Sequence, residues 1–175
     1  MKNIEIKIKF IGQDQLKDVT DLLKENNAEY KGILNQSDTY FNCSMGRLKI
    51  RGINNEQFEL IFYTRPDSFD EEISNIQIMT LTKEDADKLK DFFSKALGIF
   101  SVITKRRELW IYKNTRIHLD IVQNLGYFME LETVIGADEG EALKEYKEIS
   151  SILKIDNHKK ISGSYSDLVN KNNNY

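Results

Sequence analysis

The sequence predicts an α+β fold: an eight-stranded antiparallel β-barrel, or tunnel, with a charged interior and helices packed on its outside. Four segments alternate apolar with charged or polar residues, as half-buried strands do. Eight extended segments are separated mostly by short turns, and strands joined in this way are antiparallel. Eight strands can close into a barrel that is filled by side chains or holds one small ligand. Three further segments carry apolar residues at helical spacing.

The first expected strand, residues 3–10, has two chemically different faces. Asn3, Glu5 and Lys7 alternate there with isoleucines, and side chains alternate across a strand with period two. One face is therefore an apolar wall, and the other mixes a carboxylate with cations. The same alternation recurs at 47–51 and 116–121, and Glu130-Leu131-Glu132 repeats it.

The remaining elements follow in order along the chain. A helix at roughly 13–26 carries leucines at helical spacing, and strands follow at about 28–41, 46–53, 56–65 and 72–80. A second helix at 83–97 has Thr82 as its N-cap and Gly98 just past its end. Strands at about 100–112, 115–122 and 127–135 precede a third helix at 138–153.

The charged faces of the strands can point either into the barrel or into solvent. The isoleucines and leucines of the alternating strands need cover, so outer helices would bury them and the charged side would face into the barrel. An open sheet with water on its charged face is the alternative.

A chain of 175 residues is most simply one domain, and we expect it to cover residues 1–169, with a polar, frayed tail at 170–175. A 40% share of hydrophobic residues is enough for a sizeable core. Only one proline occurs, and no Pro/Gly/Ser-rich stretch divides the chain.

Composition excludes several classes of function. No window approaches 18 apolar residues, and the chain enters its first strand without a signal-peptide core, so we expect a cytoplasmic protein without membrane association. The net charge of −3 argues against a nucleic-acid binder, and any anion affinity must come from local clusters. Cys43 lacks an evident histidine partner, which argues against zinc or Cys/His catalysis. The composition leaves monomer and homodimer both open.

Cations cluster on the expected strands and share a parity within each strand. They are Lys7, Lys9, Arg47, Lys49, Arg51, Arg65, Lys105, Arg107 and Arg116. For any single cation, a solvated surface position is the commoner outcome. Converging buried cations, however, need a counter-anion, and phosphate chains are the natural one. The joint pattern therefore favours a site for a strongly anionic ligand.

Carboxylates lie on the same faces, at Glu5, Asp120, Glu130 and Glu132. Glu130 and Glu132 project from one side of a strand, and two carboxylates at that spacing can share Mg²⁺ or Mn²⁺. Cross-strand ion pairs with nearby cations are an equally good explanation from spacing alone.

The ordered motifs resemble those of CYTH-domain proteins, members of the triphosphate tunnel metalloenzymes, which include class IV adenylyl cyclases and thiamine triphosphatases. The resemblance spans nearly the whole chain. Its segments are Asn3-Ile4-Glu5-Ile6-Lys7, Gln36-Ser37-Asp38-Thr39-Tyr40-Phe41, Arg47-Leu48-Lys49-Ile50-Arg51, Glu59-Leu60-Ile61, Arg65-Pro66-Asp67, Lys105-Arg106-Arg107, Arg116-Ile117-His118-Leu119-Asp120, Leu125-Gly126-Tyr127-Phe128-Met129-Glu130-Leu131-Glu132 and Ser164-Tyr165-Ser166-Asp167-Leu168.

The resemblance implies a tunnel that binds triphosphate on its cations and holds Mg²⁺ or Mn²⁺ on glutamates. By position, the implied catalytic residues are Glu5, Lys7 and Glu130. The implied phosphate contacts are Lys7, Arg47, Lys49, Arg65, Lys105, Arg107 and Arg116. The implied metal ligands are Glu5, Glu130 and Glu132, with Glu59 assisting.

Three functions follow from this resemblance. The preferred one is a class IV adenylyl cyclase-like enzyme that converts ATP to cyclic AMP and pyrophosphate, and the run at 125–128 favours this branch. The second is a triphosphatase acting on thiamine triphosphate or inorganic tripolyphosphate. The third is a non-catalytic module that binds phosphate or nucleotide. Two departures from the family favour it: Asn3 replaces the first glutamate of the N-terminal motif, and residues 68–73 carry an acidic run where a glycine and a lysine are common.

Overall fold

The structure, a computed structural model, describes residues 2–64 and 72–173. Its strands are β1 (Lys2–Lys9), β2 (Glu29–Phe41), β3 (Arg47–Ile53), β4 (Gln57–Thr64), β5 (Glu72–Leu81), β6 (Ile99–Tyr112), β7 (Thr115–Val122), β8 (Gly126–Val134) and β9 (Lys159–Lys160). Its helices are α1 (Gln13–Glu25), α2 (Lys83–Ala96), α3 (Glu139–Ile152) and α4 (Tyr165–Asn173), with a short 3₁₀ turn at Ile155–Asn157.

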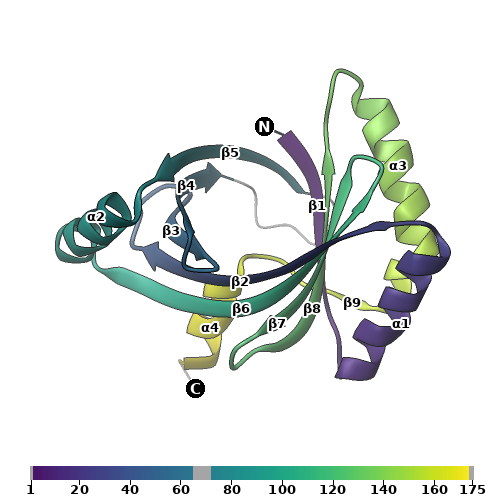
Figure 1. Cartoon of the computed structure of the whole chain (residues 1–175), viewed down its shortest axis with the longest axis horizontal. Helices are drawn as coiled ribbons and strands as arrows, with labels where there is room; N and C mark the ends of the chain where they lie inside the picture. The colour runs from purple at the N-terminus through teal and green to yellow at the C-terminus, as the bar shows by residue number, and fades with distance from the viewer. Residues whose placement is uncertain (1, 65–71, 174–175) are drawn as a thin grey trace.

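The strands form one antiparallel sheet that curls back on itself. Their order is β5-β4-β3-β2-β6-β7-β8-β1-β9, and β1 also pairs with β5. In this second pairing, Lys2–Glu5 of β1 run against Glu72–Asn75 of β5. Figure 1 shows β5 arching across to β1, so that β1 to β8 surround a common interior. This arrangement confirms the predicted α+β antiparallel tunnel, and β9 adds a short strand that the sequence did not predict.

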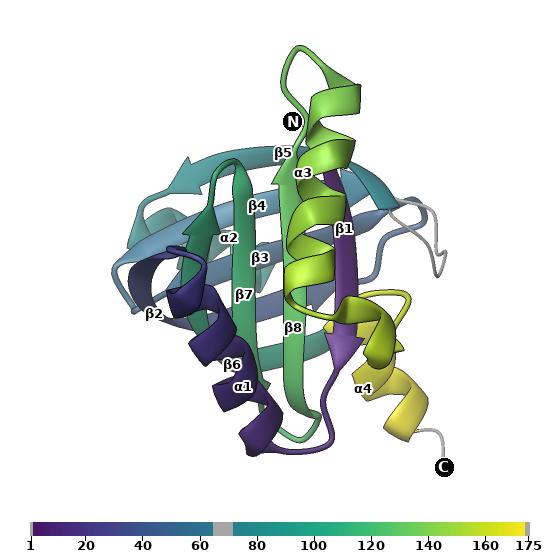
Figure 2. The same ribbon diagram turned by 90° about the vertical axis from the view of Figure 1, so that its right-hand side faces the viewer.

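Two helices cover the apolar face of the sheet. Figure 2 shows α1 and α3 lying in front of β7, β8 and β1. Ile8 of β1, Ile117 of β7 and Leu131 of β8 are fully buried in one cluster with Leu23 of α1 and Ile149 of α3. The apolar parity of these strands therefore faces outward to the helices, and their charged parity faces inward. α2 covers a second cluster at the other side of the molecule, against β4 and β2.

The helix ends follow local signals in the sequence. The Thr82 side chain accepts a hydrogen bond from the backbone N–H of Asp85 and so caps α2. Asp138 does the same for α3, accepting from the backbone N–H groups of Gly140 and Glu141. Among the described residues, no helix has the length and apolar character needed to cross a lipid bilayer.

The last helix, α4, was not predicted. It packs against β6 and extends through residues 170–173, which the sequence had placed in a frayed tail. Its first residue, Tyr165, is buried in a cluster with Tyr40, Tyr63 and Phe128. Tyr40, Tyr63 and Tyr165 also face the interior of the sheet, and α4 therefore brings a residue from the C-terminal part of the chain to that interior.

Candidate functional site

A cavity of about 290 Å³ lies inside the curled sheet. Nine of the residues predicted to form the site line it: Glu5, Lys7, Lys49, Glu59, Lys105, Arg107, Arg116, Glu130 and Glu132. Arg51 and His118 line it too, together with apolar residues that include Leu34, Ile53 and Leu109. The inward-facing residues of β1, β3, β4, β6, β7 and β8 thus meet in this one cavity.

Strand register sets which of these side chains are neighbours. Lys7 of β1 lies opposite Glu130 of β8, which lies opposite His118 of β7. One step along the strands, Glu5 lies opposite Glu132, and Glu132 lies opposite Arg116. Residues directly opposite on one face of a sheet are within contact distance, so two rows of charged groups cross the same wall of the cavity.

Asp38 of β2 anchors two cations of the cavity wall. The residue is 1% exposed, and its carboxylate accepts hydrogen bonds from Arg51 Nε at 2.7 Å, Arg51 Nη2 at 2.8 Å and Lys49 Nζ at 2.9 Å. Burial opposes ionisation of this carboxyl, but Arg51 and Lys49 outweigh burial and hold its pKa well below the ordinary value. Asp38 therefore stays charged and fixes both cations.

Asp120 of β7 anchors a second pair. It accepts hydrogen bonds from Arg107 Nε at 2.7 Å and Arg107 Nη2 at 2.6 Å, and Lys105 Nζ lies 3.8 Å from its Oδ2. Burial opposes its ionisation, yet Arg107 and Lys105 lower its pKa below the ordinary value. The hydroxyl of Tyr165 also donates to Asp120, at 2.8 Å. The Tyr165 ring lies 4.5 Å from Lys7 Nζ and 4.9 Å from Lys105 Nζ.

The two glutamates of β8 make the cross-strand ion pairs that the sequence allowed. Lys7 Nζ lies 3.2 Å from Glu130 Oε1, Arg107 also donates to Glu130, and Arg116 Nε lies 3.1 Å from Glu132 Oε2. Burial opposes ionisation of Glu130, but Lys7 and Arg107 hold its pKa well below the ordinary value. Both glutamates are therefore present as carboxylates, the form that a metal ion requires.

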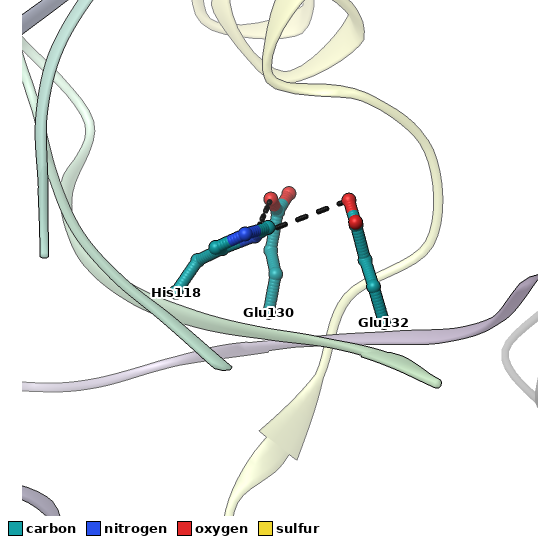
Figure 3. A group of neighbouring side chains, drawn as sticks. All are labelled: His118, Glu130 and Glu132. Atoms are coloured by element: carbon teal, nitrogen blue, oxygen red, sulfur yellow. Dashed lines mark ion pairs between the residues drawn. The ribbon is translucent and has the colours of Figure 1, made fainter. Parts of the chain in front are cut away.

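Potential metal ligands come together at His118, Glu130 and Glu132. One ligand atom from each lies within 4.8 Å of the others, and Figure 3 shows the imidazole ring facing both carboxylates. Glu5 and Glu59, the other predicted ligands, line the cavity without belonging to this group. Burial and the nearby Arg107 lower the pKa of His118, which favours the neutral ring. One nitrogen and two ionised carboxylates fit a divalent cation.

Two buried lysines of the cavity wall have lowered pKa values. Burial, and then the charge of Arg51, lowers the pKa of Lys49 to about 7. Burial, and then the charge of Arg107, lowers the pKa of Lys105 to about 8. An anion in the cavity would favour the charged form of each lysine.

One predicted phosphate contact, Arg47, does not line this cavity. Arg47 of β3 pairs with Asp167 of α4, with Nη2 and Oδ2 2.7 Å apart, and lines a separate cavity near α4. Arg65 lies outside the described residues. A phosphate-binding role for either residue stays a prediction.

Sequence reasoning missed Asp38, Tyr40 and Tyr165 as parts of the site. Asp38 and Tyr40 share the inward parity of β2 with Gln36, a signal that could have identified them. Tyr165 lies on a helix with no expected neighbour in the sheet, so its place depends on the tertiary fold alone. His118 was present only as part of a family motif, and its place beside the two glutamates was not predicted.

The model of the CYTH domain matches residues 1–165 of the chain. The chain belongs to the CYTH domain family. A relative in Methanocaldococcus jannaschii that bears the name "Putative adenylate cyclase" is 29% identical over 179 residues, covering 96% of this chain and 98% of the relative.

Solved structures support the same CYTH fold. A conserved hypothetical protein from Pyrococcus furiosus is similar with a TM-score of 0.78 at 24% identity, over 95% of this chain and 99% of that protein. A structure from Vibrio parahaemolyticus named as a putative adenylate cyclase is similar with a TM-score of 0.70 at 18% identity, over 96% and 97% of the two chains. CYTH proteins are metal-dependent as a family, and the group of His118 and two glutamates gives this member a possible metal-binding site.

Proposed function

We propose that this CYTH protein is a divalent-metal-dependent enzyme acting on a triphosphate-bearing substrate, and that the reaction is conversion of ATP to cyclic AMP and pyrophosphate. The observation that carries the proposal is one cavity in which buried cations and ionised carboxylates face the same space. Such a site matches a phosphate chain together with a divalent cation, because each has counter-charges there.

The phosphate chain would lie on Lys7, Lys49, Lys105, Arg107 and Arg116. Asp38 and Asp120 already fix three of these cations, Lys49, Lys105 and Arg107, so they need little reorganisation as charge shifts during the reaction. Preorganised charges of this kind are usually the largest electrostatic contribution to catalysis.

His118, Glu130 and Glu132 would hold the divalent cation, while Glu5 and Glu59, the other two predicted ligands, line the same cavity outside this group. When bound, the cation supplies Lewis-acid polarisation of phosphoryl oxygens and neutralises part of their charge. Metal binding at Glu130 would compete with its ion pair to Lys7 and leave Lys7 available to the phosphates, while Arg107 would stay fixed by Asp120.

An apolar part of the same cavity supports a nucleotide rather than a bare phosphate chain. Leu34, Ile53, Ile78 and Leu109 line it, and apolar side chains are suitable contacts for a base. The name of the relative from Methanocaldococcus jannaschii points to the same substrate.

In the proposed reaction, the ribose 3′-oxygen attacks the α-phosphorus and forms a new P–O bond. The bond from that phosphorus to the bridging oxygen breaks, and pyrophosphate leaves with its electron pair. The 3′-hydroxyl proton passes to a carboxylate of the cavity, for which Glu5 is our candidate, since it lines the cavity beside the β8 glutamates.

The test is product identification. The protein is incubated with ATP, tripolyphosphate or thiamine triphosphate and with Mg²⁺ or Mn²⁺, and products are separated by chromatography. Cyclic AMP with pyrophosphate supports the proposal. Release of orthophosphate from the same substrates would show that the protein is a triphosphatase and not a cyclase. Triphosphate binding without turnover would leave a binding module, for which the neutral amide of Asn3, buried opposite Val134, would be the first explanation.

Two variants connect turnover to the cavity. Glu130→Gln should lose metal-dependent turnover by at least about 100-fold, because one ligand charge is removed from the ion. Glu108→Gln is the matched control on β6, since Glu108 pairs with Arg106 and lies outside the group of cavity residues. Full metal-dependent activity in Glu130→Gln would show the metal assignment to be wrong.

A further inference from the structure

His118 lies among charged groups of the cavity wall. It lies in the middle of β7, 5% exposed, directly opposite Glu130. Its Nδ1 atom is buried and has no hydrogen-bond partner among the described residues. The great majority of buried polar atoms have a hydrogen-bond partner. A buried polar atom without one either binds a ligand or lowers the stability of the fold.

The orphaned atom is aimed at the two glutamates. Nδ1 lies 3.8 Å from Glu130 Oε2 and 3.9 Å from Glu132 Oε1, and Figure 3 marks both approaches. These separations are too long for hydrogen bonds. Ligand atoms about 2.1 Å from one octahedral ion lie roughly 3 Å apart when adjacent and roughly 4.2 Å apart when opposite. Both observed distances fall between these values, so side-chain shifts of less than about 1 Å would place Nδ1 and both carboxylates on one ion.

The chemistry of the third ligand then decides which ion the site prefers. Mg²⁺ takes oxygen ligands and gives up water reluctantly, whereas imidazole nitrogen suits transition-metal ions. Resting on the proposed metal site, we propose that His118 ligates the cation through Nδ1 and makes the site selective for a divalent transition-metal ion, tested here as Mn²⁺, over Mg²⁺.

Pulsed electron paramagnetic resonance of Mn²⁺ bound to the metal-free protein tests this directly. The wild-type spectrum should show ¹⁴N coupling from a directly bound imidazole. Growth on ¹⁵N-histidine should shift that coupling to ¹⁵N frequencies, a readout that needs no variant and no turnover. Mn²⁺ bound at a Glu130-dependent site without any nitrogen coupling would overturn the role of His118 and leave the metal site standing.

Variants measure the selectivity. His118→Asn can place an amide oxygen near the position of Nδ1, so it should retain Mn²⁺, lose the imidazole coupling and reduce the Mn²⁺/Mg²⁺ affinity ratio by about tenfold or more. His158→Asn is the matched control, because His158 packs edge-on against Phe10, away from the cavity. A ratio unchanged in His118→Asn would contradict the proposal. An Mn²⁺ affinity that is unchanged in Glu130→Gln would contradict both the proposed metal site and this inference.

Discussion

At the scale of single residues, the cavity wall is built from charges that stabilise one another. Asp38 holds Lys49 and Arg51, and Asp120 holds Arg107 with Lys105 nearby. Buried charges are costly unless they are paired and hydrogen-bonded. The two aspartates therefore keep the cations in place when no ligand is bound, a role that the sequence reasoning had not assigned to either aspartate.

Removing one anchor should destabilise the protein. In Asp38→Asn, two buried cations lose their carboxylate, and the free energy of unfolding should fall by about 3–5 kcal/mol, measured by urea denaturation. Glu84→Gln is the control, since the Glu84–Lys88 pair is exposed on α2 and its loss should cost less than about 0.5 kcal/mol. Equal small effects in the two variants would contradict the anchoring role.

The lowered pKa of Lys49 predicts a pH dependence of ligand binding. With a pKa of about 7 in the free protein, Lys49 is mostly neutral at pH 8, and a bound triphosphate would raise that pKa. Binding at pH 8 should therefore take up about one proton at Lys49, and affinity should fall as the pH rises from 7 to 9.

Calorimetry at pH 8 in buffers of different ionisation enthalpy measures this uptake. Lys49→Gln should show a smaller uptake than wild type, with the remainder coming from Lys105, which has a pKa of about 8. Binding without proton uptake in wild type would refute a titrating lysine at the ligand.

At the scale of elements, the sequence predicted those strands and helix ends that are determined by local residue patterns. Period-two alternation identified β1, β3 and β7, and Thr82 as N-cap placed the start of α2 at residue 83, where the structure has it. β9 and α4 were not predicted, because neither segment has a strong pattern of apolar and polar residues of its own. α4 and the loop before it are attached by tertiary contacts: Arg47 pairs with Asp167, Tyr165 donates to Asp120, and Lys7 donates to the carbonyl of Gly163 in the loop.

The two faces of β1 should separate stability from function. Ile8→Ala removes a fully buried side chain from the outer core and should lower the free energy of unfolding by about 2–5 kcal/mol, with triphosphate affinity kept in the folded fraction. Lys7→Gln changes a neighbouring residue on the inner face and should weaken triphosphate binding by about tenfold or more. Chemical denaturation and calorimetry measure the two effects, and a reversed pattern would mean that the faces are misassigned.

At the scale of the whole molecule, attraction for an anion is local. The chain has a net charge of −3, yet six basic side chains of the described residues line one cavity: Lys7, Lys49, Arg51, Lys105, Arg107 and Arg116. Parity in the sequence predicted that these side chains share an interior. It could not predict which carboxylate holds each cation, because those contacts depend on register between strands far apart in the chain. For the same reason it grouped Arg47 with the cavity residues, although Arg47 pairs with Asp167 instead.

Calorimetric titration of tripolyphosphate into the protein, with and without Mn²⁺, tests most directly whether this cavity is a metal-dependent triphosphate site. We predict one site per chain, tighter binding with Mn²⁺ than without it, and loss of the metal effect in Glu130→Gln but not in Glu108→Gln. Binding that is indifferent to Mn²⁺ and unchanged in Glu130→Gln and Lys7→Gln would contradict the assignment of this cavity.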